Sequence, residues 1–138
     1  MSQKPNSNLL RTDGGVSTAQ EPPRLLSEFE ISTLLAQLVH WTYSTERGGI
    51  ISCSYRFDNF ADAFSFMTEV AFAAERINHH PEWTNVYDRV DITLTTHDLS
   101  GVTTHDASLS RKMEFLRARS SLRPLCSDQG PLGNPFPN

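Results

Sequence analysis

The sequence has only two cysteines, no concentration of positive charge and no long apolar run. Cys53 lies in an alternating strand pattern and Cys126 near the C-terminus, so we expect no stabilising disulfide. The net charge is −4 with scattered lysines and arginines, which argues against direct nucleic-acid binding. No apolar run approaches the roughly 20 residues that span a membrane, and the N-terminus lacks the apolar core of a signal peptide. We therefore expect a soluble, cytoplasmic protein.

Apolar residues are also scarce at both ends of the chain. Residues 1–24 are mostly polar residues, glycine and proline, and residues 120–138 contain four prolines and two glycines. Such segments bury too little surface to offset the entropy of ordering them. The total of 138 residues suits one domain. We expect a single domain at residues 25–119 between flexible tails at 1–24 and 120–138.

The first half of this domain reads as a helix followed by a hairpin. Ser27 and Glu30 have capping-box spacing, and apolar residues then recur at helical intervals to Val39. A strand that begins near Trp41 stops at the turn signal of residues 47–49. Apolar and polar residues alternate from Ile51 onward, which predicts a second strand with one buried face. Its apolar positions are Ile51, Cys53, Tyr55 and Phe57.

A second helix and hairpin follow. Asp58 is the expected N-cap, and Pro81 stops the helix, so that His79 and His80 lie at its exit. Strands are expected at 84–87 and 90–97, with His97 on the polar face of the second. The apolar stripe expected to face the sheet consists of Phe60, Ala63, Phe64, Met67, Val70, Ala71, Ala74 and Ile77.

A last helix from Thr103 to about Arg119 completes the order helix, hairpin, helix, hairpin, helix. The economical solution is an α+β fold, a four-stranded antiparallel sheet of two hairpins with three helices packed on one face. Phe66 and Phe72 fall off the expected stripe of the second helix. Because a small monomer gains little by exposing them, we expect that helix also to pack against a second subunit.

Three imidazoles lie within about 20 residues, in the runs Asn78-His79-His80-Pro81-Glu82-Trp83 and Thr95-Thr96-His97-Asp98. One interpretation is a helix C-terminus that attracts imidazolium through the macrodipole. A second is a zinc site, although no cysteine is near and HExxH spacing is absent. A third is proton transfer on a flat ring bound beside the indole, because histidine both donates and accepts protons near neutral pH.

A longer match separates these interpretations. The runs from Phe60 to Ala71, from Glu75 to Tyr87, at Thr96-His97 and from Gly101 to Asp106 closely resemble pterin-4a-carbinolamine dehydratase, within a similarity that covers roughly residues 25–119. The resemblance implies a homotetramer that removes water from 4a-hydroxytetrahydropterin to give quinonoid dihydropterin in tetrahydrobiopterin recycling. No electrons are transferred, so no metal or redox cofactor is expected. His79, His80 and His97 would share the acid, base and orienting roles, with His80 or His79 favoured as the acid.

Further residues of the expected pterin site follow from the same resemblance. Asn78 and Asp98 stand where a common family version has Asp and Glu, changes that keep the proton-transfer groups. Trp83 is either a wall of the pocket or a large core residue. The expected substrate-binding residues are Asn78, Pro81, Trp83, Thr95, Thr96 and Asp98.

Other polar residues have simpler interpretations. Asp106 belongs to the family pattern, but its spacing from Thr103 favours a role at the start of the last helix. Glu75 either orients a histidine or lies on a solvated helix face. His40 and His105 are taken as surface residues. The alternative function is a dimerisation cofactor that binds a homeodomain transcription factor through the helical face, which would place the protein in the nucleus as well.

Overall fold

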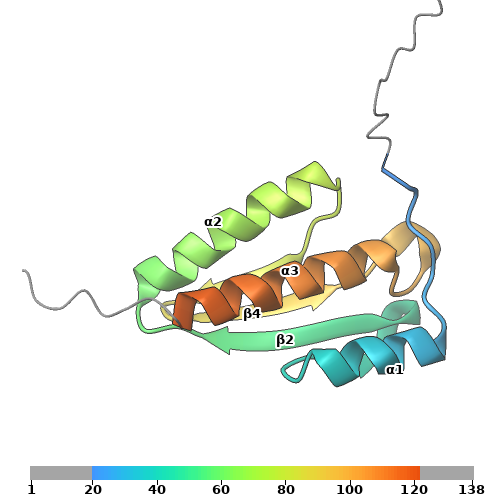
Figure 1. Cartoon of the computed structure of the whole chain (residues 1–138), viewed down its shortest axis with the longest axis horizontal. Helices are drawn as coiled ribbons and strands as arrows, with labels where there is room; N and C mark the ends of the chain where they lie inside the picture. Colours follow the sequence, from blue (N-terminus) through green and yellow to red (C-terminus); the bar gives the residue numbers. More distant parts are fainter. Residues whose placement is uncertain (1–19, 122–138) are drawn as a thin grey trace, which may run out of the picture.

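The computed structural model describes residues 20–121 (Figure 1). Residues 1–19 and 122–138 fall outside that range, so the prediction that the two tails are flexible stays a prediction, as do the predicted domain bounds. The elements in chain order are α1 (Glu28–Gln37), β1 (Thr42–Ser44), the 3₁₀ turn η1 (Glu46–Gly48), β2 (Ile50–Arg56), α2 (Phe60–Arg76), β3 (Glu82–Val86), β4 (Arg89–Leu94), the 3₁₀ turn η2 (His97–Leu99) and α3 (Thr104–Ser121).

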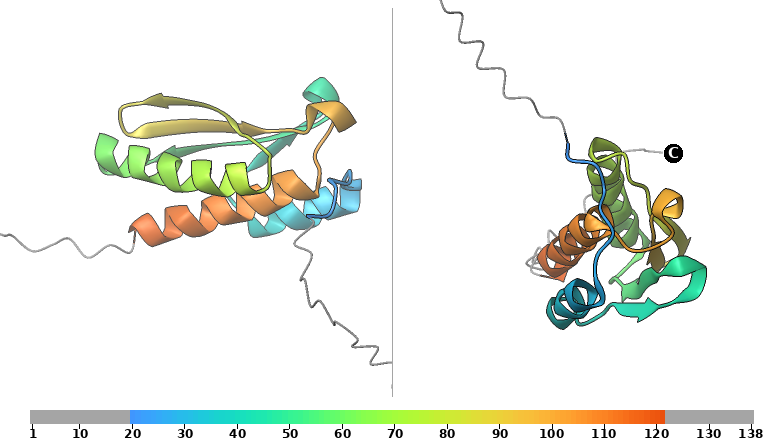
Figure 2. Two further views of the ribbon diagram at one scale, coloured as in Figure 1. Left: turned by 90° about the horizontal axis from the view of Figure 1, so that it is seen from above. Right: turned by 90° about the vertical axis from the view of Figure 1, so that its right-hand side faces the viewer.

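The four strands form one antiparallel sheet in the order β1-β2-β4-β3. All three helices lie on one face of it (Figure 2), so the predicted α+β fold is confirmed. Alternation along the strands separates the faces: Cys53 pairs with Ile92 towards the helices, whereas Ser52 pairs with Thr93 on the open face. No helix within residues 20–121 is long and apolar enough to cross a membrane.

Local sequence signals set two of the helix starts. The Ser27 side chain accepts from the Glu30 N–H and the Glu30 side chain accepts from the Ser27 N–H, so the predicted capping box of α1 is confirmed. The predicted cap of α2 by Asp58 is wrong, because Asn59 takes that position and its side chain accepts from the Asp62 N–H at 2.9 Å. Both residue types are good N-caps, and Asn59 takes the position because its backbone has the extended conformation that an N-cap requires.

The predicted buried stripe of α2 is partly wrong. Phe66 is only 1 % exposed, and its ring meets those of Tyr55 and Phe57 at centroid distances of 5.6 and 5.1 Å. Phe60 and Phe64, expected inside, are 48 % and 54 % exposed. Phenylalanines occur around most of this helix. The sequence pattern is therefore compatible with either of two faces of α2 packing against the sheet. Packing selects the face of Ala63, Phe66, Val70, Ala73 and Ala74.

Candidate functional site

The candidate site is a hollow of about 590 Å³ at the end of the molecule where α2 stops, η2 turns and α3 begins. Four histidines line it, three from the predicted cluster and His105 in addition. Asn78, Thr95, Thr96 and Asp98 also line it, as predicted for a substrate site. The remaining lining residues are Ile77 and the segment Gln20–Pro23.

The end of α2 fixes the position of the vicinal histidines. Asn78 has a φ of 48°, a left-handed conformation that asparagine tolerates better than most residues. Its N–H donates to the Glu75 carbonyl at 3.2 Å, and the His79 N–H donates to the Ala74 carbonyl at 3.1 Å. These two bonds form a Schellman motif that closes the helix. Asn78 therefore shapes the backbone on which His79 is mounted, besides lining the hollow.

His79 is held by a fully buried carboxylate. Its Nε2 lies 2.6 Å from Oδ1 of Asp106, and the side chains of His79 and Asp106 are 10 % and 0 % exposed. Asp106 also accepts from the Thr103 N–H and the Thr96 hydroxyl, both at 2.8 Å. An ionised carboxylate only accepts, so Nε2 of His79 carries the proton and the ring can rotate little. The predicted role of Asp106 at the start of α3 is confirmed by its bond to Thr103, and its pairing with His79 was not foreseen.

The other two predicted histidines also have carboxylate partners. Nε2 of His80 lies 2.9 Å from Oε2 of Glu75, and Nε2 of His97 lies 3.0 Å from Oε1 of Glu82. The Arg47 guanidinium donates to both oxygens of Glu82, which holds the pKa of that carboxyl below its usual value. Glu82 is therefore ionised and able to accept from His97 at neutral pH.

In all three pairs the carboxylate engages Nε2. Among residues 20–121, no protein group forms a hydrogen bond with Nδ1 of His79, His80 or His97. A neutral imidazole with its proton on Nε2 presents a lone pair at Nδ1, and an imidazolium presents an N–H there. The arrangement can therefore offer both an acid and a base to one bound ring.

The prediction that His97 projects from a strand is wrong. β4 ends at Leu94, and His97 opens η2, where Ser100 adopts a left-handed φ of 51°. The loop of η2 packs so closely against η1 that a Cβ at Gly48 would be 2.2 Å from the Ser100 carbonyl oxygen. The Thr95 hydroxyl donates to the Gly49 carbonyl at 2.8 Å. Contacts with the first hairpin thus end β4 early and turn His97 into the hollow.

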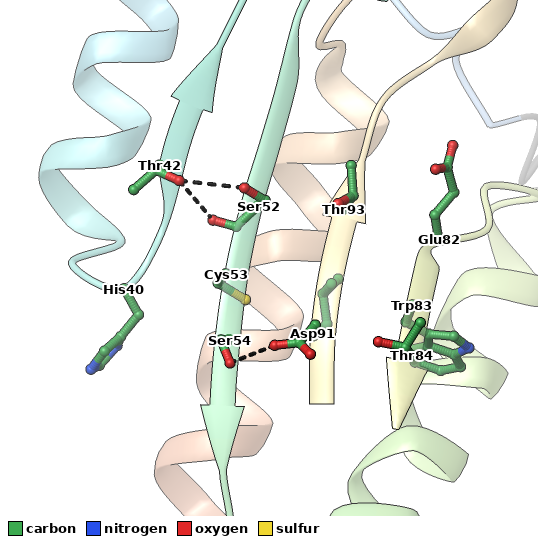
Figure 3. A pocket seen from close by; sticks show the side chains of 11 residues that line it. His40, Thr42, Ser52, Cys53, Ser54, Glu82, Trp83, Thr84, Asp91 and Thr93 are labelled. Carbon is green, nitrogen blue, oxygen red and sulfur yellow. Dashed lines mark hydrogen bonds between the residues drawn. The ribbon is translucent and has the colours of Figure 1, made fainter. Parts of the chain in front are cut away.

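Pro81 and Trp83 do not line the histidine hollow. Trp83 pairs with Ile92 across the sheet and packs against the edge of the core. It instead lines a second hollow of about 620 Å³ on the open face of the sheet (Figure 3). Hydroxyls dominate that surface, where Thr42 bonds to Ser52 and Ser54 donates to Asp91 at 2.7 Å. Of the five histidines only His40 lines it, so the other four gather elsewhere.

Two components of the site were missed by the sequence reading. His105, taken as a surface residue, lines the hollow with its ring centroid 6.0 Å from that of His79. Gln20–Pro23 line it although the sequence predicts that they belong to a flexible N-terminal tail. No periodic or spacing signal could have found either. Within residues 20–121, no three histidine, cysteine, aspartate or glutamate side chains converge as a metal site.

Comparison with known proteins gives the fold and the site a family. The profile of the family described as pterin 4 alpha carbinolamine dehydratase matches residues 24–116. A protein of Rhizobium rhizogenes, provisionally named pterin-4-alpha-carbinolamine dehydratase, is 55 % identical over 89 residues, which is 64 % of this chain and 87 % of that one. A relative from Sinorhizobium medicae with the same name is 49 % identical over 92 residues, 67 % and 87 % of the two chains.

A solved structure is also similar. The crystal structure of a transcriptional coactivator/pterin dehydratase from Brucella melitensis has a TM-score of 0.64 and 41 % identity, and the match covers 68 % of this chain and 99 % of that one. The region that the family profile matches contains the sheet, α2 and the three predicted histidines. The chain belongs to the pterin 4 alpha carbinolamine dehydratase family.

Proposed function

We propose that this protein is a hydro-lyase that converts 4a-hydroxytetrahydropterin into quinonoid dihydropterin, in the recycling of tetrahydrobiopterin. One observation carries the proposal: His79, His80 and His97 line one hollow, and each is anchored by a carboxylate at Nε2. Family membership names the reaction, and the histidines supply groups suited to it.

The reaction needs two proton transfers. The bond between C4a and the hydroxyl oxygen breaks, and the hydroxyl accepts a proton as it leaves as water. The N5–H bond breaks, and its electron pair forms the new C=N bond at C4a while a base takes the proton. No oxidant or reductant takes part, so imidazoles of opposite protonation suffice.

The environments of the three rings suggest how the roles divide. His79 is buried and fixed by Asp106, so its Nδ1 has the most constrained position. We assign it to the N5 proton as base. His80 and His97 are 58 % and 68 % exposed and can exchange protons with solvent between turnovers. We assign to His80 the protonation of the leaving hydroxyl, and to His97 an orienting role. The edge of the pterin ring would be bound by Asn78, Thr95, Thr96 and Asp98.

A turnover assay with 4a-hydroxytetrahydropterin tests this function. His79→Ala, His80→Ala and His97→Ala should each lower turnover, by about 10²- to 10⁴-fold for a group that transfers a proton. His40→Ala is the matched control, because His40 pairs with Glu114 and does not line the hollow. Activity should survive exhaustive chelation. Loss of activity with EDTA and its recovery with zinc would refute the metal-free mechanism. Full activity in all three histidine variants would refute histidine catalysis.

We propose further that the protein is a homo-oligomer, a tetramer by the resemblance. Phe60, Phe64 and Phe72 are 48 %, 54 % and 70 % exposed on α2. Apolar rings grouped on one helix are typical of a protein interface. We place the activity in the cytoplasm, where the free thiol of Cys53 would stay reduced.

A dimerisation cofactor for a homeodomain transcription factor is the second candidate. The Brucella melitensis structure is named as a transcriptional coactivator as well as a dehydratase, and the same α2 phenylalanines would form the binding face. Substitution separates the two functions. Phe64→Ser with Phe72→Ser should abolish binding to such a factor, whereas His79→Ala should lower turnover and leave binding intact.

A further inference from the structure

The segment Gln20–Pro23 lies before the part of the chain that the family profile matches, yet it forms one wall of the histidine hollow. In Figures 1 and 2 this first described stretch, in blue, runs past the end of α2 and the start of α3. One wall of the hollow is therefore formed by a piece of chain outside the matched region.

Hydrogen bonds hold this segment at both sides of the hollow. The Gln20 side-chain amide donates to the carbonyl of Arg76, the last residue of α2, at 2.6 Å. Nε2 of His105 donates to the Glu21 carbonyl at 3.2 Å. The Thr104 N–H then donates to the Arg24 carbonyl at 2.9 Å, which fixes the segment to the first turn of α3.

The segment is also stiff. Pro22 and Pro23 have their φ angles fixed near −65° by the ring, and the residue before each proline is restricted as well. A stiff segment anchored at its ends can hold a wall position that a flexible tail could not. Its position therefore limits how large a substituent the bound ring can carry.

The charge of the site gives this wall a second effect. Glu21 and Asp98 are the acidic lining residues, and no lysine or arginine is among the residues of the described chain that line the hollow. An anionic substituent would meet carboxylates without a permanent cation to pair with. A neutral, hydrogen-bonding substituent would meet no such repulsion.

We propose that Gln20–Pro23 is a specificity strap that admits pterins with small uncharged substituents and disfavours those that carry a carboxylate or phosphate. This inference rests on the proposed function, because it assumes that a pterin occupies the hollow. The backbone of the strap sets the size limit, and the Glu21 carboxylate contributes to the charge preference.

Equilibrium binding tests the strap without relying on turnover. The probes are 6-hydroxymethylpterin and pterin-6-carboxylate, which share a ring and differ in charge, followed by ligand fluorescence. The full-length chain should bind the neutral probe more tightly. Glu21→Gln should narrow the ratio of the two dissociation constants by about 2- to 5-fold, the range for one partly exposed charge. Glu28→Gln is the matched control, since it removes the same charge from an exposed residue that does not line the hollow.

A second variant tests the wall itself. Pro22→Gly with Pro23→Gly, in the full-length chain, should weaken binding of both probes and reduce their discrimination, while the circular dichroism spectrum stays unchanged. If the wild type binds pterins but all variants keep its ratio, the strap is refuted and the proposed function stands. If the wild type binds neither probe, the proposed function fails and the strap fails with it.

Discussion

Replacing Asp106 with asparagine should separate the proposed role of its charge in catalysis from its role in folding. Asp106 accepts at Oδ1 from His79, and at Oδ2 from the Thr103 N–H at 2.8 Å, the Thr96 hydroxyl at 2.8 Å and the Thr103 hydroxyl at 3.1 Å. The backbone N–H can only donate, so the side-chain oxygen of the introduced asparagine must stay there. Its amide NH₂ then faces His79, whose Nε2 must become an acceptor and whose proton moves to Nδ1.

That move removes the lone pair from Nδ1 of His79, which has no hydrogen-bond partner among residues 20–121. Loss of a general base lowers turnover by about 10²- to 10⁴-fold. A hydrogen bond to a charged group contributes about 1.5–3 kcal/mol against about 1 for a neutral one, so the variant should lose about 0.5–2 kcal/mol of stability. For a domain of about 100 residues this corresponds to a fall in Tm of roughly 2–16 °C. The protein should remain folded at 25 °C.

The assays are turnover of 4a-hydroxytetrahydropterin at 25 °C, thermal melting by circular dichroism, and ¹⁵N NMR of the His79 ring to locate its proton. Glu114→Gln is the matched control. Glu114 also lies on α3 and accepts from a tyrosine hydroxyl and a histidine, Tyr55 at 2.5 Å and His40 at 2.9 Å, away from the hollow. It should lower Tm without lowering turnover. A folded Asp106→Asn protein with nearly full turnover would refute the assignment of His79 as the base.

Three other outcomes are expected. Burial raises the pKa of the Cys53 thiol to about 12 and raises the pKa of Tyr55 as well, whereas both groups ionise at lower pH in the unfolded chain. The free energy of unfolding from urea titrations should therefore fall as pH rises above about 9, by up to about 1.4 kcal/mol per pH unit for each group; a flat profile between pH 8 and 10.5 would contradict this. Phe64→Ser with Phe72→Ser should shift the mass from light scattering towards the 15.5 kDa of one chain, and a wild type that is already monomeric would remove the interface argument. Asn78→Gly should melt close to the wild type, whereas Asn78→Val should lose about 1–2 kcal/mol because its backbone is left-handed; equal melting of the two would show that this conformation is not required.

The sequence predicted best what depends on local pattern. Strand alternation identified the buried face of β2, and the spacing of Ser27 and Glu30 located the start of α1. The rotation of α2 was not predictable, because phenylalanines satisfy a helical period on two faces and only packing against Tyr55 and Phe57 selects Phe66. Local rules fail where long-range contacts decide.

The candidate site shows the same division. The runs containing His79, His80 and His97 were visible as a cluster, and one interpretation made Glu75 the partner of a histidine, as it is of His80. The pairings of Asp106 with His79 and of Glu82 with His97 were not predicted. Asp106 is separated from His79 by 27 positions, and Glu82 from His97 by 15. The first pair forms because the fold brings the end of α2 to the start of α3, and the second forms because β3 pairs with β4 just before η2. The strap was missed for a different reason: a proline-rich segment has no apolar period, and its order comes from hydrogen bonds to other elements.

The double role of Asp106 ties activity to local unfolding. Its carboxylate accepts from the Thr103 N–H at the start of α3 and from His79 in the hollow. Helix ends open more often than whole domains do, with a smaller free energy. Each opening of this first turn would release the His79 ring from its tautomer and orientation. On slow heating, activity should therefore decline before the far-ultraviolet signal of the helices, and hydrogen exchange at Thr103 should report the fraction of molecules that are momentarily inactive.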